Sequence, residues 1–151
     1  MFFGYILIIS SFILYSSYSS YSYSKKEKRV STYKEIKELT KVNRVINSYS
    51  YIPEEDEGTK DHWKTSEEFY KDGGGDCEDF AIAKYDLLKN NHSVAIAVGY
   101  YNDKPKQYHA VLLVDSSWIL DSNLDEVVYY DIYCKYFTII ALTDTKKNRI
   151  D

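Results

Sequence analysis

The chain has 151 residues and a mass of 17.7 kDa, which suits one domain with a single hydrophobic core. Hydrophobic residues make up 44% and charged residues 28%, with 6 glycines and 2 prolines, a composition typical of a globular protein. The formal net charge is -4 and no Lys/Arg stripe alternates with aromatics, so we expect no nucleic-acid partner. The two cysteines, Cys77 and Cys134, form no CxxC pair, which argues against a disulfide scaffold, structural zinc and thioredoxin-like chemistry.

The N-terminus resembles a targeting segment. Residues 2–15 (FFGYILIISSFILY) are apolar and almost uncharged. The segment is shorter than the roughly 20 residues that a membrane-spanning helix needs. They fit the apolar region of a secretory signal, and the Tyr/Ser tract at 15–24 offers cleavage sites. Basic residues follow the apolar run at 25–29, which opposes export, so an uncleaved anchor and a cytoplasmic strand remain alternatives. We predict a signal-like segment over 1–24 and one domain over 25–151.

Three helices are predicted, each by a capping residue followed by apolar residues at helical spacing. The stretch from Tyr51 to Asp61 contains a proline, a glycine and four consecutive acids, and is predicted to be a solvated loop. In chain order the predicted helices cover 33–48, the residues between Thr65 and Gly73, and the residues from Asp76 to about Lys89.

After Asn91 the pattern changes from helical to extended. Short runs rich in β-branched and aromatic residues predict strands. Helices followed by strands predict the α+β class, with a helical layer on a mostly antiparallel sheet. The predicted strands are 94–101, 109–114, 118–121, 127–130 and 136–142, and a polar tail begins at Thr143.

Cys77 is the first feature with chemical potential. It lies at the start of the third predicted helix, directly after Asp76 and a three-glycine turn. Backbone amides at a helix N-terminus can lower the pKa of a thiol and can hold an oxyanion that develops during a reaction. The alternative is a small buried cysteine without a chemical role, because free cysteines are among the most buried residues.

His109 begins one predicted strand and Asp121 ends the next. If residues 115–117 form a three-residue loop, Val114 pairs with Trp118, and the two side chains become diagonal neighbours with Cα atoms about 7–8 Å apart. A carboxylate at that distance can orient an imidazole. A two- or four-residue loop would instead place the side chains on opposite faces, and His109 would have only a structural role.

Three acids, Asp76, Glu78 and Asp79, surround Cys77. They can simply cap the helix, but their charges oppose formation of a thiolate. A bound hard cation would remove that conflict, and adjacent carboxylates provide the oxygen ligands that Ca²⁺ prefers. The sequence therefore indicates a possible calcium site beside the cysteine.

The block GGDCEDFAIAKY at 74–85 resembles the signature of the bacterial transglutaminase-like cysteine peptidases of the LapG type. The likeness extends over about residues 33–126 and includes VNRVIN at 42–47, HAVL at 109–112 and Leu120-Asp121. The resemblance implies a papain-like, transglutaminase-like α+β fold. It also implies a catalytic set of Cys77 as nucleophile, His109 as base and Asp121 as orienting acid, and calcium ligands from Asp76, Glu78 and Asp79.

Peptidases of this type are periplasmic and cut large surface adhesins, and some are held inactive by an inner-membrane cyclic-di-GMP receptor. The resemblance therefore implies an exported, calcium-dependent cysteine endopeptidase that acts through a thioester on a cell-surface adhesin or similar protein. Two alternatives remain: transglutaminase- or amidase-type acyl transfer, and a catalytically idle binding module of the same fold. The Cys77 N–H is one expected oxyanion donor, and Trp63, Asn43 and Asn47 are candidates for the second.

Overall fold

The computed structural model describes residues 32–53 and 62–143. The chain divides into two compact units, 1–37 and 38–151, and of the first unit only the helical residues 32–37 are described. Helical structure reaches residue 47, in agreement with the first predicted helix. The signal-like segment and the polar tail after Thr143 lie outside the described residues, and of the predicted acidic loop only residues 51–53 are described. None of the described helices has both the length and the apolar character needed to cross a bilayer.

The second and third helices begin and end where the capping pattern predicts. Helix α2 (Ser66–Asp72) starts at the N-cap Thr65, whose N–H donates to the Glu68 carboxylate at 2.7 Å while the Glu68 N–H donates back to the Thr65 hydroxyl at 3.3 Å. Gly73 ends it in the left-handed conformation, with φ 79°. Helix α3 (Cys77–Leu88) follows directly, with Asp76 as its N-cap.

A two-residue parallel ladder precedes α3 and was not predicted. Strand β1 (Ser50–Tyr51) pairs with β2 (Gly74–Gly75). Gly74 has φ 149°, and a Cβ there would lie 1.8 Å from the Ser50 carbonyl oxygen. A Cβ on Gly75 would lie 2.2 Å from an Asp79 carboxylate oxygen. The glycines therefore let the chain pass between β1 and the first turn of α3 immediately before Cys77.

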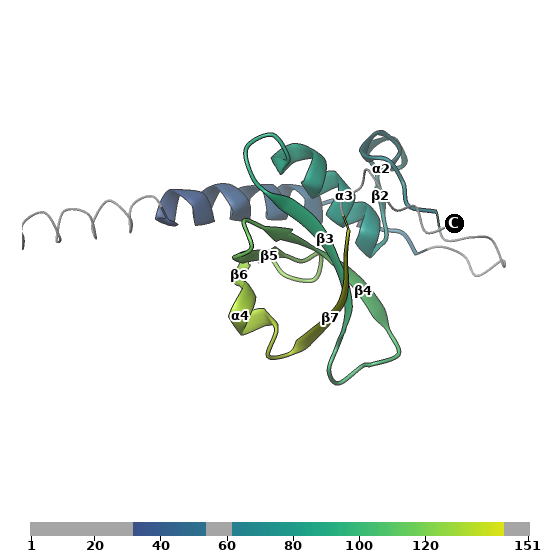
Figure 1. Ribbon diagram of the computed structural model, residues 1–151. Helices are drawn as coiled ribbons and strands as arrows, with labels where there is room; N and C mark the ends of the chain where they lie inside the picture. Colours follow the sequence, from purple (N-terminus) through teal and green to yellow (C-terminus); the bar gives the residue numbers. More distant parts are fainter. Residues whose placement is uncertain (1–31, 54–61, 144–151) are drawn as a thin grey trace, which may run out of the picture. The chain divides into compact units, whose positions relative to one another are not determined.

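The remaining elements are β3 (Val94–Tyr101), β4 (Tyr108–Val114), β5 (Trp118–Leu120), β6 (Val128–Tyr129), α4 (Tyr130–Tyr133) and β7 (Phe137–Thr143). The five strands among them form one antiparallel sheet in the order β6-β5-β4-β3-β7 (Figure 1). The strand predicted at 127–130 is only partly correct, because its last residue begins a short helix, α4. Strand β5 is three residues long and pairs with β6 at only two positions, so the ladder ends and the chain turns.

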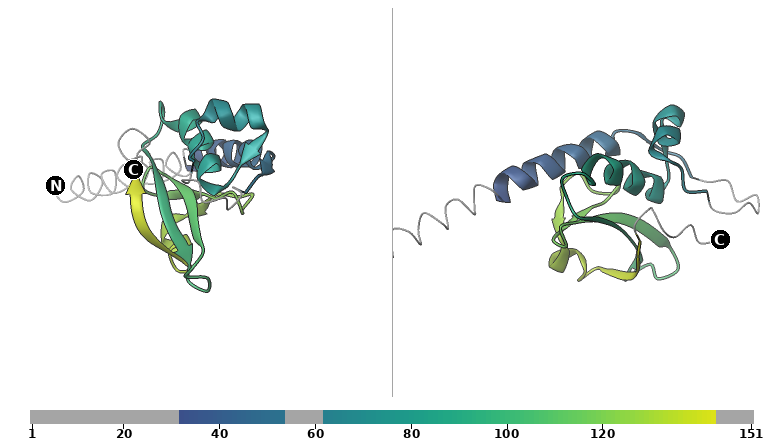
Figure 2. Two further views of the ribbon diagram at one scale, coloured as in Figure 1. Left: turned by 90° about the vertical axis from the view of Figure 1, so that its right-hand side faces the viewer. Right: turned by 45° about the horizontal axis from the view of Figure 1, so that its top comes forward.

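Apolar side chains cover both faces of the sheet. On β4, Ala110, Leu112 and Val114 pack into one core cluster with residues of α3, while Val111 and Leu113 pack into a second cluster that includes residues of α4 and β7. Two further views show α3 against the sheet and α4 beside the curved end of β7 (Figure 2). Because side chains alternate along a strand, these positions put His109 on the same face as Val111. The predicted α+β class is confirmed.

Candidate active site

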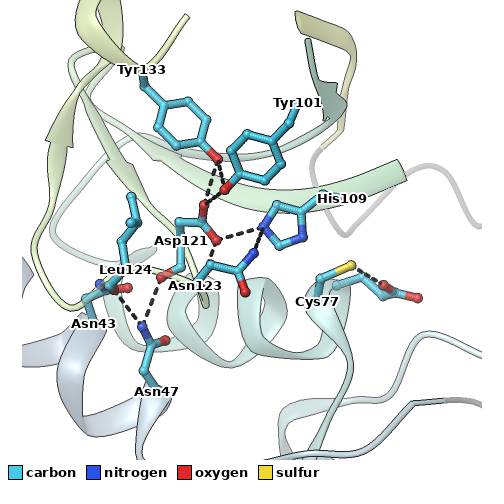
Figure 3. Close-up of polar contacts among 10 residues, drawn as sticks. Asn43, Asn47, Cys77, Tyr101, His109, Asp121, Asn123, Leu124 and Tyr133 are labelled. Carbon is cyan, nitrogen blue, oxygen red and sulfur yellow. Dashed lines mark hydrogen bonds and ion pairs between the residues drawn. The ribbon is translucent and has the colours of Figure 1, made fainter. Parts of the chain in front are cut away.

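Cys77 is the first residue of α3, and its sulfur lies between that helix and the start of β4. The backbone N–H of Ala110, the residue after His109, donates a hydrogen bond to the sulfur. On the other side the sulfur lies 3.1 Å from a carboxylate oxygen of Glu78 (Figure 3). The side chain is half-buried. The expected position of Cys77 at a helix N-terminus after a tight glycine turn is confirmed.

The surroundings of the Cys77 sulfur favour its protonated form. Burial raises the pKa of Cys77, and the negative charges of Glu78 and Asp76 raise it further, to about 12, while the Ala110 N–H acts in the opposite direction. The sulfur is then a thiol that donates to Glu78. The conflict between the flanking acids and thiolate formation, expected from the sequence, is present in the structure.

His109 and Asp121 come together as the predicted register requires. Val114 pairs with Trp118 across a three-residue loop, and the His109 Nε2 lies 2.7 Å from the Asp121 Oδ1. In Figure 3 the other ring nitrogen, Nδ1, lies on the side of the imidazole that faces Cys77. Asp121 and Cys77 thus lie on opposite sides of the same ring.

Asp121 is fully buried, with 0% of its surface exposed, yet it is well supplied with donors. Its Oδ1 accepts from His109 and from the Asn123 N–H at 2.9 Å, and its Oδ2 accepts from the hydroxyls of Tyr101 at 2.5 Å and Tyr133 at 2.7 Å. Burial acts to raise the pKa of Asp121, but the hydrogen bond to His109 and the histidine's charge, followed by the other donors, bring it down to about 2. The group is a carboxylate at any physiological pH.

The two tyrosines were not predicted. Tyr101 could have been found, because Gly99 pairs with His109 and Tyr101, two residues further along β3, lies diagonally across on the same face. Tyr133 could not, because it comes from α4, where the sequence predicts no helix. With 17 tyrosines in the chain, residue type alone distinguishes neither.

Two asparagines of the first helix brace the segment that follows Asp121. The Asn43 amide donates to the Leu124 carbonyl at 2.6 Å, and the Asn47 amide donates to the carbonyls of Asp121 at 2.9 Å and Leu124 at 2.8 Å. These contacts give Asn43 and Asn47 a structural task and do not support the expectation that either donates to an oxyanion. Trp63, the third candidate, packs against the first core cluster.

The three acids around Cys77 differ in what their oxygens already bind. Asp79 accepts the Lys64 N–H at 2.7 Å and the Asp76 N–H at 3.3 Å, so both of its oxygens hold backbone amides. Glu78 accepts from Cys77. Within residues 32–53 and 62–143, no three His, Cys, Asp or Glu side chains are arranged as a metal site. Asp76 and Glu78 flank Cys77 in the sequence, and their carboxylates suit a hard cation such as Ca²⁺ by donor chemistry.

Comparison with known proteins identifies the family of the chain. The family model of bacterial transglutaminase-like cysteine proteinases matches residues 14–147. Calcium-bound LapG of Legionella pneumophila is 30% identical with a TM-score of 0.62, and the match covers 71% of this chain and 64% of that one. EGTA-treated LapG of the same organism is 31% identical with a TM-score of 0.61, covering 70% and 61%.

The chain therefore spans less than two thirds of the LapG chains that it matches. A comparison with curated proteins gives no match. The family model covers most of the chain, and Cys77, His109 and Asp121 lie within the matched range. The chain belongs to the bacterial transglutaminase-like cysteine proteinases.

Proposed function

We propose that this cysteine peptidase is an endopeptidase that works through a thioester acyl-enzyme, with Cys77 as nucleophile, His109 as base and Asp121 as orienting acid. The observation that carries the proposal is the order of the three groups: the carboxylate holds Nε2 of the imidazole, and Nδ1 faces the sulfur at the start of α3. This is the arrangement in which one group orients the base and the base activates the nucleophile.

In the proposed reaction, His109 takes the proton from the Cys77 thiol as the sulfur attacks a peptide carbonyl carbon. The C–N bond then breaks, His109 gives its proton to the leaving amine, and a thioester remains on Cys77. Water, deprotonated by His109, attacks the thioester, which releases the carboxylate product and returns the thiol. The Cys77 backbone N–H, at the N-terminus of the 12-residue helix α3, supplies one oxyanion donor.

Calcium dependence is part of the proposal. Its support is the acid pair Asp76 and Glu78, whose charges raise the pKa of Cys77, together with the likeness to a calcium-bound LapG. Asp76 and Glu78 would hold the ion, with Asp79 as a further ligand or as the group that fixes the Asp76 backbone. A bound cation would offset the negative potential at the sulfur.

We further propose that the enzyme acts in the periplasm on a surface adhesin or a similar exported protein, under the control of an inner-membrane cyclic-di-GMP receptor. The apolar residues 2–15 and the resemblance of the 74–85 block to the LapG type support this proposal. A peptidase requires a protein substrate, and the adhesin is the substrate class that the resemblance implies.

The decisive experiment compares cleavage of adhesin N-terminal fragments by the full chain and by Cys77→Ala, with Cys134→Ala as the matched control. Loss of Cys77 should abolish cleavage because no other described residue is positioned to form the thioester, while Cys134→Ala should cleave at the wild-type rate. Unchanged cleavage by Cys77→Ala would refute the mechanism.

Two measurements separate the alternatives. Product masses distinguish hydrolysis, which gives two fragments, from acyl transfer to an amine, which gives a crosslinked product. An electrophilic thiol probe separates the enzyme from an idle binding module of the same fold: the enzyme's Cys77 should react in the folded protein, whereas the Cys77 of an idle module should not.

A further inference from the structure

The carboxylate of Asp121 has one oxygen for the imidazole and another that faces away from it. His109 and the Asn123 N–H occupy Oδ1, while the hydroxyls of Tyr101 and Tyr133 occupy Oδ2. Four donors fill the roughly four lone-pair positions of a carboxylate. A group that is 0% exposed would otherwise lose its hydration without compensation.

The donor roles of the two hydroxyls follow from the distances. The Tyr133 hydroxyl lies 2.7 Å from the Asp121 Oδ2 and 3.2 Å from the Tyr101 hydroxyl, so its single proton goes to the carboxylate. Burial and the Asp121 charge raise the pKa of Tyr133, and burial and the hydrogen bond to Asp121 raise that of Tyr101 to about 12. Both phenols therefore stay protonated and keep donating.

Tyr101 also contacts the imidazole. Its ring lies 5.7 Å from the His109 ring, centroid to centroid, at an interplanar angle of 23°. Phe137 packs edge-on against both rings, at 5.3 Å from Tyr101 and 6.3 Å from His109. Tyr101 thus contacts the Asp121 carboxylate through its hydroxyl and the His109 imidazole through its ring.

We propose that Tyr101 and Tyr133 are positioning residues of this peptidase: together they bind Oδ2 of Asp121, so that Oδ1 is presented to His109 and the ring is held with Nδ1 toward Cys77. The proposal rests on the proposed function, in which His109 is the base. Lys84 of α3, which is buried, also acts on Asp121 through its charge. Within the described part of the chain, the structure records no hydrogen bond from Lys84 to either oxygen of the Asp121 carboxylate, and the two hydroxyls are bound to Oδ2.

The test uses Tyr101→Phe, Tyr133→Phe and the double variant, each of which keeps the aromatic ring and removes one or two donors. Tyr108→Phe is the matched control, because Tyr108 precedes His109 on β4 but is 68% exposed. Each hydroxyl makes a hydrogen bond to a charged group, so we expect kcat to fall about tenfold or more in each single variant, which corresponds to about 1.4 kcal/mol in the activation free energy. KM should stay within about twofold, because neither hydroxyl is placed to bind substrate.

The second readout does not need activity. The His109 Nε2–H proton, identified by its absence in His109→Ala, should give an NMR resonance that moves and exchanges faster with water in the tyrosine variants but not in Tyr108→Phe.

Folded variants with wild-type kcat and an unchanged resonance would overturn the proposal. If wild-type protein cleaves no peptide but the resonance responds, the proposed function fails and the positioning role stands. If the double variant does not fold, the kcat and the resonance of Tyr101→Phe test the proposal. In that variant the Tyr133 hydroxyl still donates a hydrogen bond to Oδ2 of Asp121.

Discussion

At the scale of single residues, Asp121 is the most constrained group of the site. It is buried, ionised and bound by four donors. Its contact with His109 could be predicted because strand periodicity and the length of one loop are enough to fix two neighbours. The hydroxyl of Tyr133 could not, because it reaches the carboxylate from an element with no local sequence pattern.

Asp121→Asn should nearly abolish activity. An amide cannot accept from four donors, and its NH₂ group would confront either the His109 Nε2–H or the two phenols, so the imidazole loses its orientation. We expect kcat to fall by on the order of 10³ to 10⁴, the loss seen when the acid of a catalytic triad becomes an amide. Asp125→Asn, an exposed change four residues further on, is the control. A value for Asp121→Asn within tenfold of wild type would show that the acid does not orient the base.

At the scale of elements, the hairpin between β4 and β5 sets the site. A three-residue loop at 115–117 was the condition on which the predicted contact of His109 with Asp121 depended, and the structure has that loop. Asp115 and Ser116 in it both have positive φ, at 50° and 53°. The β1–β2 ladder and α4 were missed because two and four residues are too few to show a period. Sequence periodicity and capping residues are enough to predict the long elements and their ends. The short elements form through contacts with residues distant in the sequence, which a local pattern does not show.

Ser116→Gly should stabilise the fold. Glycine adopts positive φ without the steric cost that an L side chain has there, so we expect a gain of about 1 kcal/mol in the free energy of unfolding. Ser116→Val, with a β-branched side chain at the same position, should have the opposite effect. Urea unfolding of both variants tests this, and equal midpoints for the two would contradict the turn geometry.

Lys84, on the buried face of α3, should make the free energy of unfolding depend on pH. It is 1% exposed; burial lowers its pKa to about 7, against the attraction of the Asp121 charge. The unfolded chain, with an ordinary lysine pKa of about 10.4, then binds more protons than the folded chain between about pH 7 and 10. The free energy of unfolding therefore rises with pH between about pH 7 and 10. Below about pH 7 the folded chain carries the full cost of burying the Lys84 charge.

Lys84→Met should remove that dependence. The variant should gain about 1–4 kcal/mol relative to wild type at pH 6, and the gain should shrink toward pH 10. Thermal unfolding at the two pH values measures it, with the exposed Lys41→Met as control. A difference between Lys84→Met and wild type that is the same at both pH values would mean that Lys84 is not buried as a charge.

At the scale of the whole molecule, the order of helices before strands was enough to predict the α+β class. The place of β7 beside β3 was not predictable, because it joins segments about 40 residues apart without a local signal. The site depends on this arrangement: Phe137 of β7 packs on both Tyr101 and His109. The family block at 74–85 pointed to Cys77 as the proposed nucleophile, and the sheet holds the two residues proposed to act with it, His109 and Asp121.

Calcium binding is expected to stabilise the molecule as a whole. An ion that binds only the folded chain raises the free energy of unfolding by about 2.7 kcal/mol at a concentration 100 times its Kd. EGTA should therefore lower the melting temperature and the rate of peptide cleavage, and added Ca²⁺ should restore both. Asp76→Asn with Glu78→Gln should make the melting temperature insensitive to EGTA. Unchanged melting and cleavage after chelation would contradict the calcium proposal.

The central claim is that the Cys77 sulfur is activated by His109, and iodoacetamide labelling followed by intact and peptide mass measurement tests it most directly. In the calcium-loaded full chain we expect Cys77 to be alkylated faster than Cys134, and we expect this advantage to disappear in His109→Ala, which cannot take the thiol proton. Alkylation of Cys77 no faster than that of Cys134, or a rate that His109→Ala leaves unchanged, would contradict the account.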